Sequence, residues 1–227
     1  MGPDYLEALD PAARQRLLST GGRRSYPARS YLFHEGDEPT GVLMVEAGLL
    51  RVDRTSASGR VVLLDLATAG SLCGELGVID DAPRSATAST VTDCTIRHIP
   101  AGVFREVLGS NLDAQAAIIR RLTRRLRALS TQFVETSTMD APSRIAARLV
   151  RLVEIDRQLG TGAVSHGGII DLKLPISQED LGHWSGLSRE GAVKGLTILR
   201  SIGLIETGRK RVVILDYDAL AARAAAI

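Results

Sequence analysis

The chain has 227 residues, of which 44% are hydrophobic and 24% charged, so it is long enough for one or two domains with a buried core. The formal net charge is +2, and the aromatic content of 4% argues against a broad stacking surface for single-stranded nucleic acid. Two cysteines are too few for a disulfide framework or for a zinc or iron–sulfur site, and we expect no metal. The N-terminal segment carries charges throughout and no run of about 18 apolar residues occurs, so we expect neither signal peptide nor membrane helix, and a cytoplasmic location.

The first half of the chain changes from a helical to a strand pattern. A helical region is predicted from Asp4 to Leu18, with an interruption at Pro11. From Tyr26 to Pro100, short apolar runs alternate with glycine-containing turns at intervals of about ten residues. The predicted strands are Tyr31–Phe33, Val42–Val45, Leu49–Val52, Val61–Leu66 and Thr95–Ile99. This spacing is typical of an antiparallel sandwich, barrel or jelly roll.

A long helix is predicted from Asp113 to Ser137, after a short one near Val103–Val107. It carries an apolar seam at steps of four, three and four residues, which spans about two heptads and consists of Leu122, Leu126, Leu129 and Phe133. The seam either packs on its own domain or forms a two-stranded dimer contact. Five arginines between positions 120 and 127 favour the dimer, because they leave little other apolar surface on the helix.

The segment Asp140–Ser143 interrupts the helical pattern, because the residue before Pro142 is disfavoured in a helix. A second helix is predicted from Ser143 to Leu159, followed by a flexible turn from Gly160 to Gly168. We therefore predict an α+β protein in three parts: a β-roll resembling a jelly roll over residues 1–111, a long helix over 112–139 and a C-terminal domain over 140–227.

The small net charge conceals two halves of opposite sign. Residues 26–99 contain six basic and ten acidic side chains, a net charge of −4. Residues 188–215 contain six basic and two acidic side chains, a net charge of +4. The two halves are therefore expected to have different partners, and the basic half is suited to a polyanion.

The basic half contains two predicted short helices, Ser177–Gly186 and Ser188–Ser201. Ser177 and Asp180 have the spacing of a capping box, and Ser188 is the predicted N-cap of the second helix. The apolar contacts that would hold the two helices at a steep angle are Leu181, Leu187, Val193, Leu196 and Leu199. This arrangement is the helix-turn-helix plan, whose second helix enters the major groove of DNA.

The first turns of the second helix carry side chains suited to reading bases. Arg189 and Lys194 can donate to guanine, and Glu190 can accept from the cytosine amino group. A strand–turn–strand follows, with Arg209, Lys210 and Arg211 at its tip, and this predicts a wing that contacts phosphates. The segment from Ile176 to Lys194 resembles the winged helix-turn-helix of the cyclic AMP receptor and FNR family of bacterial transcription regulators. The resemblance implies that Arg189, Glu190 and Lys194 read an operator half-site.

Three residues of the second helix depart from this family pattern. Gly191, Ala192 and Gly195 replace the usual threonine, valine and bulkier apolar residue. Glycine within a helix costs up to about 1 kcal/mol relative to alanine. We therefore expect a less rigid recognition helix, which lacks a base or phosphate contact from position 191.

A glycine-rich cassette, Gly74 to Thr87, carries the densest signal in the acidic half. Gly74 lets the backbone approach a ligand, and a short helix starting after Leu76 would direct N–H groups at an anion. Arg84 and Ser85 are donors for a phosphate, and Glu75 is an acceptor for a sugar hydroxyl. The cassette resembles that of cyclic-nucleotide-binding domains. The alternative is that it only fixes a corner of the sheet.

The resemblance runs from about Tyr26 to Leu215 and implies a role for each cassette residue. Arg84 and Ser85 would hold the cyclic phosphate, Glu75 the ribose 2′-hydroxyl, and Gly74 and Leu76 would lend backbone groups. Arg125 would hold Glu75 from behind. The positions that contact adenine in the cyclic AMP receptor align with Leu129 and Ser130. The resemblance implies cyclic AMP as the ligand. Ser130 or Thr131 can bond a base, whereas Leu129 cannot, and this departure leaves cyclic GMP as an alternative.

The combined features predict a homodimeric transcription regulator rather than an enzyme. Double-stranded DNA and RNA polymerase are the expected partners, and no membrane is involved. A ligand would act by population shift, through Arg125 and Ser130 on the long helix, and set the two recognition helices one DNA turn apart. One alternative is a DNA-binding regulator whose roll is ligand-independent or senses another signal. Another is a nucleotide-sensing module that acts through protein partners.

Overall fold

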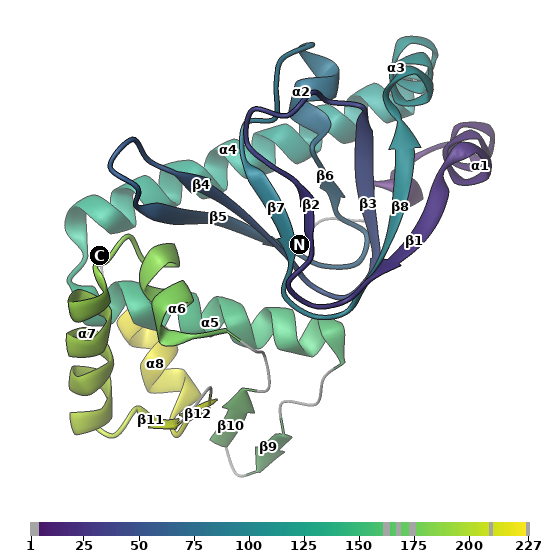
Figure 1. Cartoon of the computed structure of the whole chain (residues 1–227). Coiled ribbons are helices and arrows are strands. Elements are labelled where there is room, and N and C mark those ends of the chain that lie inside the picture. The colour runs from purple at the N-terminus through teal and green to yellow at the C-terminus, as the bar shows by residue number, and fades with distance from the viewer. Residues whose placement is uncertain (1–4, 161–163, 167–168, 173–175, 209–210, 226–227) are drawn as a thin grey trace. The chain divides into compact units, whose positions relative to one another are not determined.

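The computed structural model describes residues 5–160, 164–166, 169–172, 176–208 and 211–225 (Figure 1). The chain divides into two compact units, Met1–Gly59 with Leu64–Ala128, and Arg60–Leu63 with Leu129–Ile227. The boundary between Ala128 and Leu129 falls within the long helix, α4 Leu112–Thr138. In the part of the chain described, no helix combines the length and the apolar character that a membrane span requires.

The first unit begins with a single-turn helix, Leu6–Ala8, and with α1, Pro11–Thr20. The predicted interruption at Pro11 is confirmed. Asp10 caps α1, because its carboxylate accepts hydrogen bonds from the amides of Ala12 and Ala13, and proline is well suited to the first helical position.

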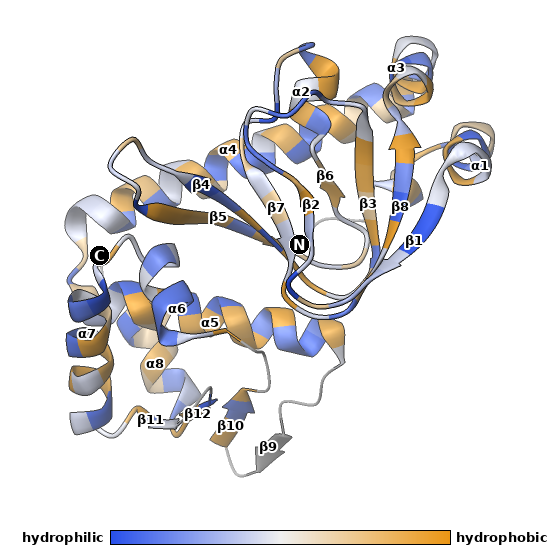
Figure 2. Cartoon of the chain, in the orientation of Figure 1, coloured by the Kyte–Doolittle hydropathy of each residue, from blue (hydrophilic) through white to orange (hydrophobic). Residues whose placement is uncertain are grey.

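Two four-stranded antiparallel sheets form the β-roll, in the orders β1-β8-β3-β6 and β2-β7-β4-β5 (Figure 1). The strands are β1 Gly22–Tyr26, β2 Tyr31–Phe33, β3 Gly41–Ala47, β4 Leu50–Thr55, β5 Val61–Ala67, β6 Leu72–Cys73, β7 Thr87–Thr90 and β8 Cys94–Pro100. The fold-class prediction is confirmed. Strands β1, β6 and β7 were not predicted. Strand β1 is hydrophilic, whereas β3 is hydrophobic over most of its length (Figure 2). Strand β6 has only two residues, and β7 consists of threonine, alanine and serine, which form no apolar run.

The other helices of the first unit are α2 Glu75–Ile79, α3 Ala101–Ser110 and the part of α4 Leu112–Thr138 that ends at Ala128. A buried cluster joins α1, β3, β8, α3 and the first part of α4 through Leu17, Val42, Ile99, Phe104 and Ile118. The N-terminal part of α4 is therefore anchored in the core of the first unit.

The second unit contains the remaining helices, α5 Ala141–Leu159, α6 Gln178–Trp184, α7 Arg189–Ser201 and α8 Tyr217–Ala225. Asp140 caps α5 through the amide of Ser143, so the predicted interruption is confirmed at Asp140. The predicted start at Ser143 was wrong, because α5 begins at Ala141 and proline is well suited to the first turn of a helix. A third sheet has the order β11-β12-β10-β9, with β9 Val164–His166, β10 Ile169–Leu172, β11 Ile205–Gly208 and β12 Arg211–Ile214.

The prediction of a flexible turn over Gly160–Gly168 was wrong in part, because β9 lies within it. Strand β10 pairs with β9 and also with β12, where Ile170 is opposite Ile214. A partner this distant in sequence leaves no local pattern, so the wing hairpin of β11 and β12 was predicted, whereas the addition of β10 and β9 to it was not.

Candidate nucleotide pocket and DNA-binding face

The cassette backbone turns sharply at Gly74, which has a φ of 81° and is the N-cap of α2. Helix α2 begins at Glu75, so the expected start after Leu76 was wrong. A Cβ at Gly74 would collide with Nη1 of Arg84. Glycine is therefore required here both for its positive φ and for the close approach of Arg84.

Arg84 is buried, with 5% of its surface exposed, and the protein itself holds its guanidinium. Nη1 donates to the carbonyl of Gly74 and Nη2 to that of Gly41, each at 2.6 Å. The guanidinium carbon lies 4.3 Å from the ring centroid of Phe33, a cation–π geometry. Nε is buried and finds no hydrogen-bond partner among the described residues. Burial lowers the pKa of Arg84.

Glu75 is also buried, with 1% exposed, and two arginines of α4 approach its Oε1. Arg121 Nε lies 3.3 Å and Arg125 Nη1 3.9 Å from this oxygen. The family resemblance implies Arg125 for this contact but not Arg121. The spacing of four residues was the available signal, because such residues share a helix face. Oε2 has no hydrogen-bond partner in the described part of the chain.

A small cavity, about 20 Å³ in volume, joins the cassette residues. Its lining includes six predicted ligand residues, which are Gly74, Glu75, Leu76, Arg84, Ser85 and Arg125, and also Phe33 and Cys73. Burial raises the pKa of Cys73 to about 12, so its thiol is neutral. The cavity has room for about one water molecule. Ser130 and Thr131 belong to the second unit and are exposed, so they are not placed relative to the cavity.

The helix-turn-helix elements are found in the second unit, on α6 and α7. Ser177 and Asp180 form the predicted capping box, although α6 ends at Trp184 rather than Gly186. The Ser188 hydroxyl accepts a hydrogen bond from the amide of Gly191 at 3.1 Å, which confirms the predicted N-cap of α7. A Cβ at Gly182 would lie 3.0 Å from Cβ of Ala192, so a small residue allows the two helices to pack closely.

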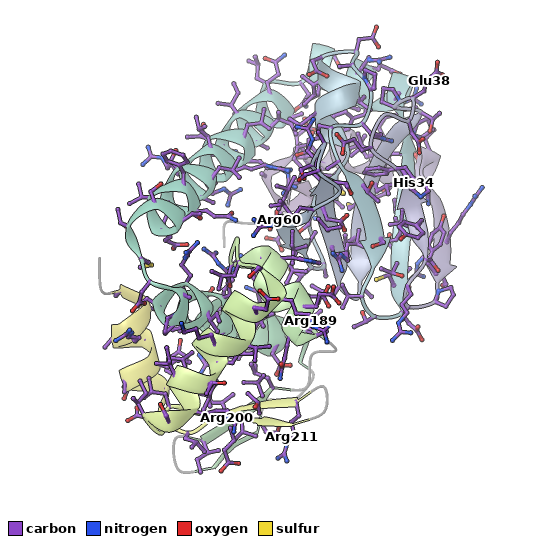
Figure 3. The ribbon with its side chains drawn as sticks, turned by 60° about the vertical axis from the view of Figure 1, so that its left-hand side comes forward. His34, Glu38, Arg60, Arg189, Arg200 and Arg211 are labelled. Atoms are coloured by element: carbon purple, nitrogen blue, oxygen red, sulfur yellow. The ribbon has the colours of Figure 1, made fainter. Side chains whose placement is uncertain are left out.

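The outer face of α7 carries the predicted reading residues. Arg189, Glu190 and Lys194 are exposed, whereas the inner face buries Ala192, Gly195, Leu196 and Leu199. Arg189 and Arg200 lie near opposite ends of α7 (Figure 3). The prediction that Val193 packs between the helices was wrong, because 46% of it is exposed. Its position, three residues after Glu190 and four after Arg189, places it on the outer face.

The wing is the hairpin of β11 and β12, and the predicted contact residues Arg209 and Lys210 lie outside the described residues. Arg211, at the start of β12 (Figure 3), donates to both carboxylate oxygens of Asp171 on β10, at 3.0 and 3.1 Å. This hydrogen bonding raises the pKa of Arg211. Arg211 therefore joins β12 to β10, and its charge is partly compensated within the protein.

Two family models match the two parts of the chain. One, described as a cyclic nucleotide-binding domain, matches residues 23–111, and the other, a Crp-like helix-turn-helix domain, matches residues 143–223. The chain belongs to the CRP/FNR family. It is therefore a DNA-binding transcription regulator with a cyclic-nucleotide-binding domain, and its relatives are regulators rather than enzymes.

Several CRP/FNR proteins are similar to this chain over most of its length. It is 26% identical over 218 residues to the CRP-like cAMP-activated global transcriptional regulator of Mycobacterium tuberculosis, covering 96% of this chain and 95% of the relative. It is 29% identical over 190 residues to the cAMP-activated regulator CRP of Haemophilus influenzae, covering 83% and 82%. The solved structure of CLP from Xanthomonas campestris, a regulator described as c-di-GMP responsive, gives a TM-score of 0.74 at 26% identity, covering 90% and 99%.

Regulators of the CRP/FNR family act as dimers, and α4 carries the apolar seam expected of a dimer contact. Hydrophobic and hydrophilic residues alternate along this helix (Figure 2). The exposed fractions are 65% for Leu126, 41% for Leu129 and 74% for Phe133. Leu122 is half-buried and packs on the core of the first unit. Packing within the described chain therefore accounts for Leu122, whereas Leu126 and Phe133 are largely exposed and Leu129 is partly exposed.

Proposed function

We propose that this CRP/FNR regulator binds a cyclic purine nucleotide, in the first place cyclic AMP, in the cavity lined by Glu75 and Arg84. The observation that carries the proposal is a pair of buried atoms of opposite type, Arg84 Nε as a donor and Glu75 Oε2 as an acceptor, neither of which has a hydrogen-bond partner among the described residues. An unmet buried polar atom costs about 1–3 kcal/mol. A ribose phosphate supplies both complements, because its phosphate accepts and its 2′-hydroxyl donates.

The proposed roles of the other cavity residues follow from the groups of a cyclic nucleotide, which are its phosphate, its ribose and its base. Ser85 adds a hydroxyl for the phosphate, and Gly74 and Leu76 offer backbone groups. Arg125 lines the cavity and lies near Glu75. Ser130 or Thr131 contacts the base. The names of the relatives support cyclic AMP, with cyclic GMP as an alternative, and the similarity to CLP adds c-di-GMP to the ligands worth testing.

On the DNA side, we propose that Arg189, Glu190 and Lys194 read bases and that Ser188, Arg209 and Lys210 contact phosphates. A second copy of the chain would pack against the seam of Leu122, Leu126, Leu129 and Phe133, so that two recognition helices meet two half-sites one DNA turn apart. RNA polymerase is the proposed further partner, and a chromosomal target implies action in the cytoplasm. We also propose that the chain has three functional parts, which are the β-roll over residues 1–111, the dimerisation helix over 112–139 and the DNA-binding domain over 140–227.

A thermal-shift titration tests ligand binding. Cyclic AMP, cyclic GMP and c-di-GMP are added to wild-type protein, to Arg84→Ala and to Arg54→Gln, a matched change of an exposed arginine on the same roll. A ligand at about 100 times its Kd stabilises by about 2.7 kcal/mol, or roughly 5–10 °C in Tm. We expect this shift for wild type and Arg54→Gln but not for Arg84→Ala.

One observation favours a second candidate function, a DNA-binding regulator whose roll needs no nucleotide. The cavity is about 20 Å³, and Arg84 already donates to two carbonyls, so a nucleotide has to displace neighbouring groups. This candidate predicts no thermal shift with any of the three nucleotides. It also predicts that selected duplex DNA binds equally well with and without them, and that Arg189→Ala still weakens binding.

A further inference from the structure

Two arginines of α4 approach one oxygen of Glu75, but only one of them forms a hydrogen bond. Arg121 Nε lies 3.3 Å from Oε1 and meets the geometry of a hydrogen bond. Arg125 Nη1 is 3.9 Å away, which is an ion pair without a hydrogen bond. Arg121 therefore makes the stronger of the two interactions with the carboxylate.

Arg121 also binds the backbone that leads into the cassette. Its Nη2 donates to the carbonyl of Leu72, the first residue of β6. One guanidinium thus joins a side chain of α2 to a backbone group three residues earlier in the chain. A planar guanidinium can serve two acceptors at once, whereas the compact ammonium of lysine is less suited to this bridge.

The two arginines also differ in their relation to the cavity. Arg125 is one of the residues that line it, and Arg121 is not. Arg121 therefore holds Oε1 without occupying ligand space. Because Oε1 is engaged, the buried Oε2 is the oxygen that remains for a ligand hydroxyl.

We propose that Arg121 is the positioning residue for recognition of the ribose 2′-hydroxyl, because it fixes the Glu75 carboxylate with Oε2 presented to the ligand. The inference rests on the proposed nucleotide-binding function. It assigns to Arg121 the role that the family resemblance implied for Arg125. Glu75 would contact both Arg121 and the 2′-hydroxyl, and a coupling between these two contacts acts in both directions. Binding of the hydroxyl would therefore also affect residues 112–128 of α4.

The test compares each cyclic nucleotide with its 2′-deoxy counterpart. Dissociation constants of cyclic AMP and 2′-deoxy cyclic AMP, and of the two guanosine equivalents, are measured by calorimetry for wild type, Arg121→Gln, Arg121→Lys and Arg125→Gln. Arg120→Gln is the matched control, since Arg120 is exposed on the same helix. A hydrogen bond to a carboxylate predicts that wild type prefers the ribonucleotide by about 10- to 100-fold.

We expect Arg121→Gln to reduce this preference to below about 3-fold, because it removes the partner that fixes the carboxylate. Arg125→Gln should reduce the preference less, and Arg120→Gln should retain it. Arg121→Lys should be intermediate, because it keeps the charge but loses the bridge. Without ligand, Arg121→Gln should lower the Tm more than Arg125→Gln does, since it leaves a buried carboxylate poorly paired.

Two results would overturn the inference alone. In one, Arg121→Gln weakens both nucleotides equally and keeps their ratio. In the other, Arg125→Gln abolishes the ratio and Arg121→Gln does not. If wild-type protein binds none of the four nucleotides, the inference and the proposed function both fail, so the two kinds of failure are distinguishable.

Discussion

Gly195 of the recognition helix packs directly against Ile145 of α5. A Cβ at Gly195 would lie 2.6 Å from Cδ1 of Ile145 and 3.3 Å from the backbone of Ala141. From the helix propensity of glycine alone, Gly195 predicts a less rigid helix. The structure shows instead that a missing side chain lets α7 approach α5, so the glycine serves packing.

Gly195→Ala should therefore lower the free energy of unfolding by about 1–3 kcal/mol, the usual cost of overpacking, although alanine is the better helix former. Urea unfolding measures the change. Adding Ile145→Val removes the closest atom and should restore part of the loss.

Gly191→Ala is the matched control for that experiment. A Cβ at Gly191 would lie 3.4 Å from the Ser188 hydroxyl oxygen, an ordinary contact. This variant should be neutral or more stable by up to about 1 kcal/mol. Equal destabilisation by the two alanine substitutions would contradict the packing argument.

Phe33 and Arg84 should be energetically coupled even without ligand, because the guanidinium lies over the ring at 4.3 Å. A double-mutant cycle with Phe33→Leu and Arg84→Met, measured by urea unfolding, should give a coupling of about 0.5–2 kcal/mol. Tyr31→Leu is the control, since Tyr31 lies on the same strand but stacks on His34. Additive effects of the Phe33 and Arg84 substitutions would show that the cation–π contact contributes nothing.

Val193 should read a thymine methyl group, because it is an exposed apolar side chain among the proposed reading residues Arg189, Glu190 and Lys194. A duplex is first selected from random DNA, and each thymine is then replaced by uracil, which removes only the methyl. At one symmetric pair of positions the replacement should weaken wild-type binding by about 10- to 20-fold, because one buried methyl group is worth about 0.8 kcal/mol in each of the two half-sites.

Val193→Ala should remove the effect of that replacement, and every other thymine should respond alike in the two proteins. If the variant and the wild type show the same uracil profile, Val193 does not contact a thymine methyl.

Asp140 should make the second unit more sensitive to acid. Its pKa is lowered by hydrogen bonding to Ser143 and by the nearby charge of Arg223. A carboxyl group whose pKa is lower in the folded state stabilises above its unfolded value of about 3.9, and this contribution is lost as the pH falls through the folded pKa.

Asp140→Asn should therefore show a flatter loss of stability below about pH 4 than wild type, measured by urea unfolding between about pH 3 and 7. At neutral pH the two proteins should differ little, because asparagine also caps helices and an exposed ion pair is worth about 0–1 kcal/mol. Parallel curves across the acid range would rule out the contribution of Asp140.

The sequence by itself determined the features that depend on neighbours within about four residues. The Ser188 cap, the Ser177–Asp180 capping box and the break between α4 and α5 at Asp140 are of this kind, since each joins a side chain to a nearby amide. The order of roll, long helix and helix-turn-helix followed from the same short-range periodicities, together with the family resemblance.

Only the tertiary structure decided which side chains meet across long separations. Arg121 meets Glu75 over 46 residues, and β10 pairs with β12. Val193 was predicted to be buried because it is apolar, although its spacing from Arg189 and Glu190 places it on their exposed face, and its burial depends on what packs there. Short-range periodicity constrains one element at a time, whereas burial and charge pairing are properties of the assembled surfaces.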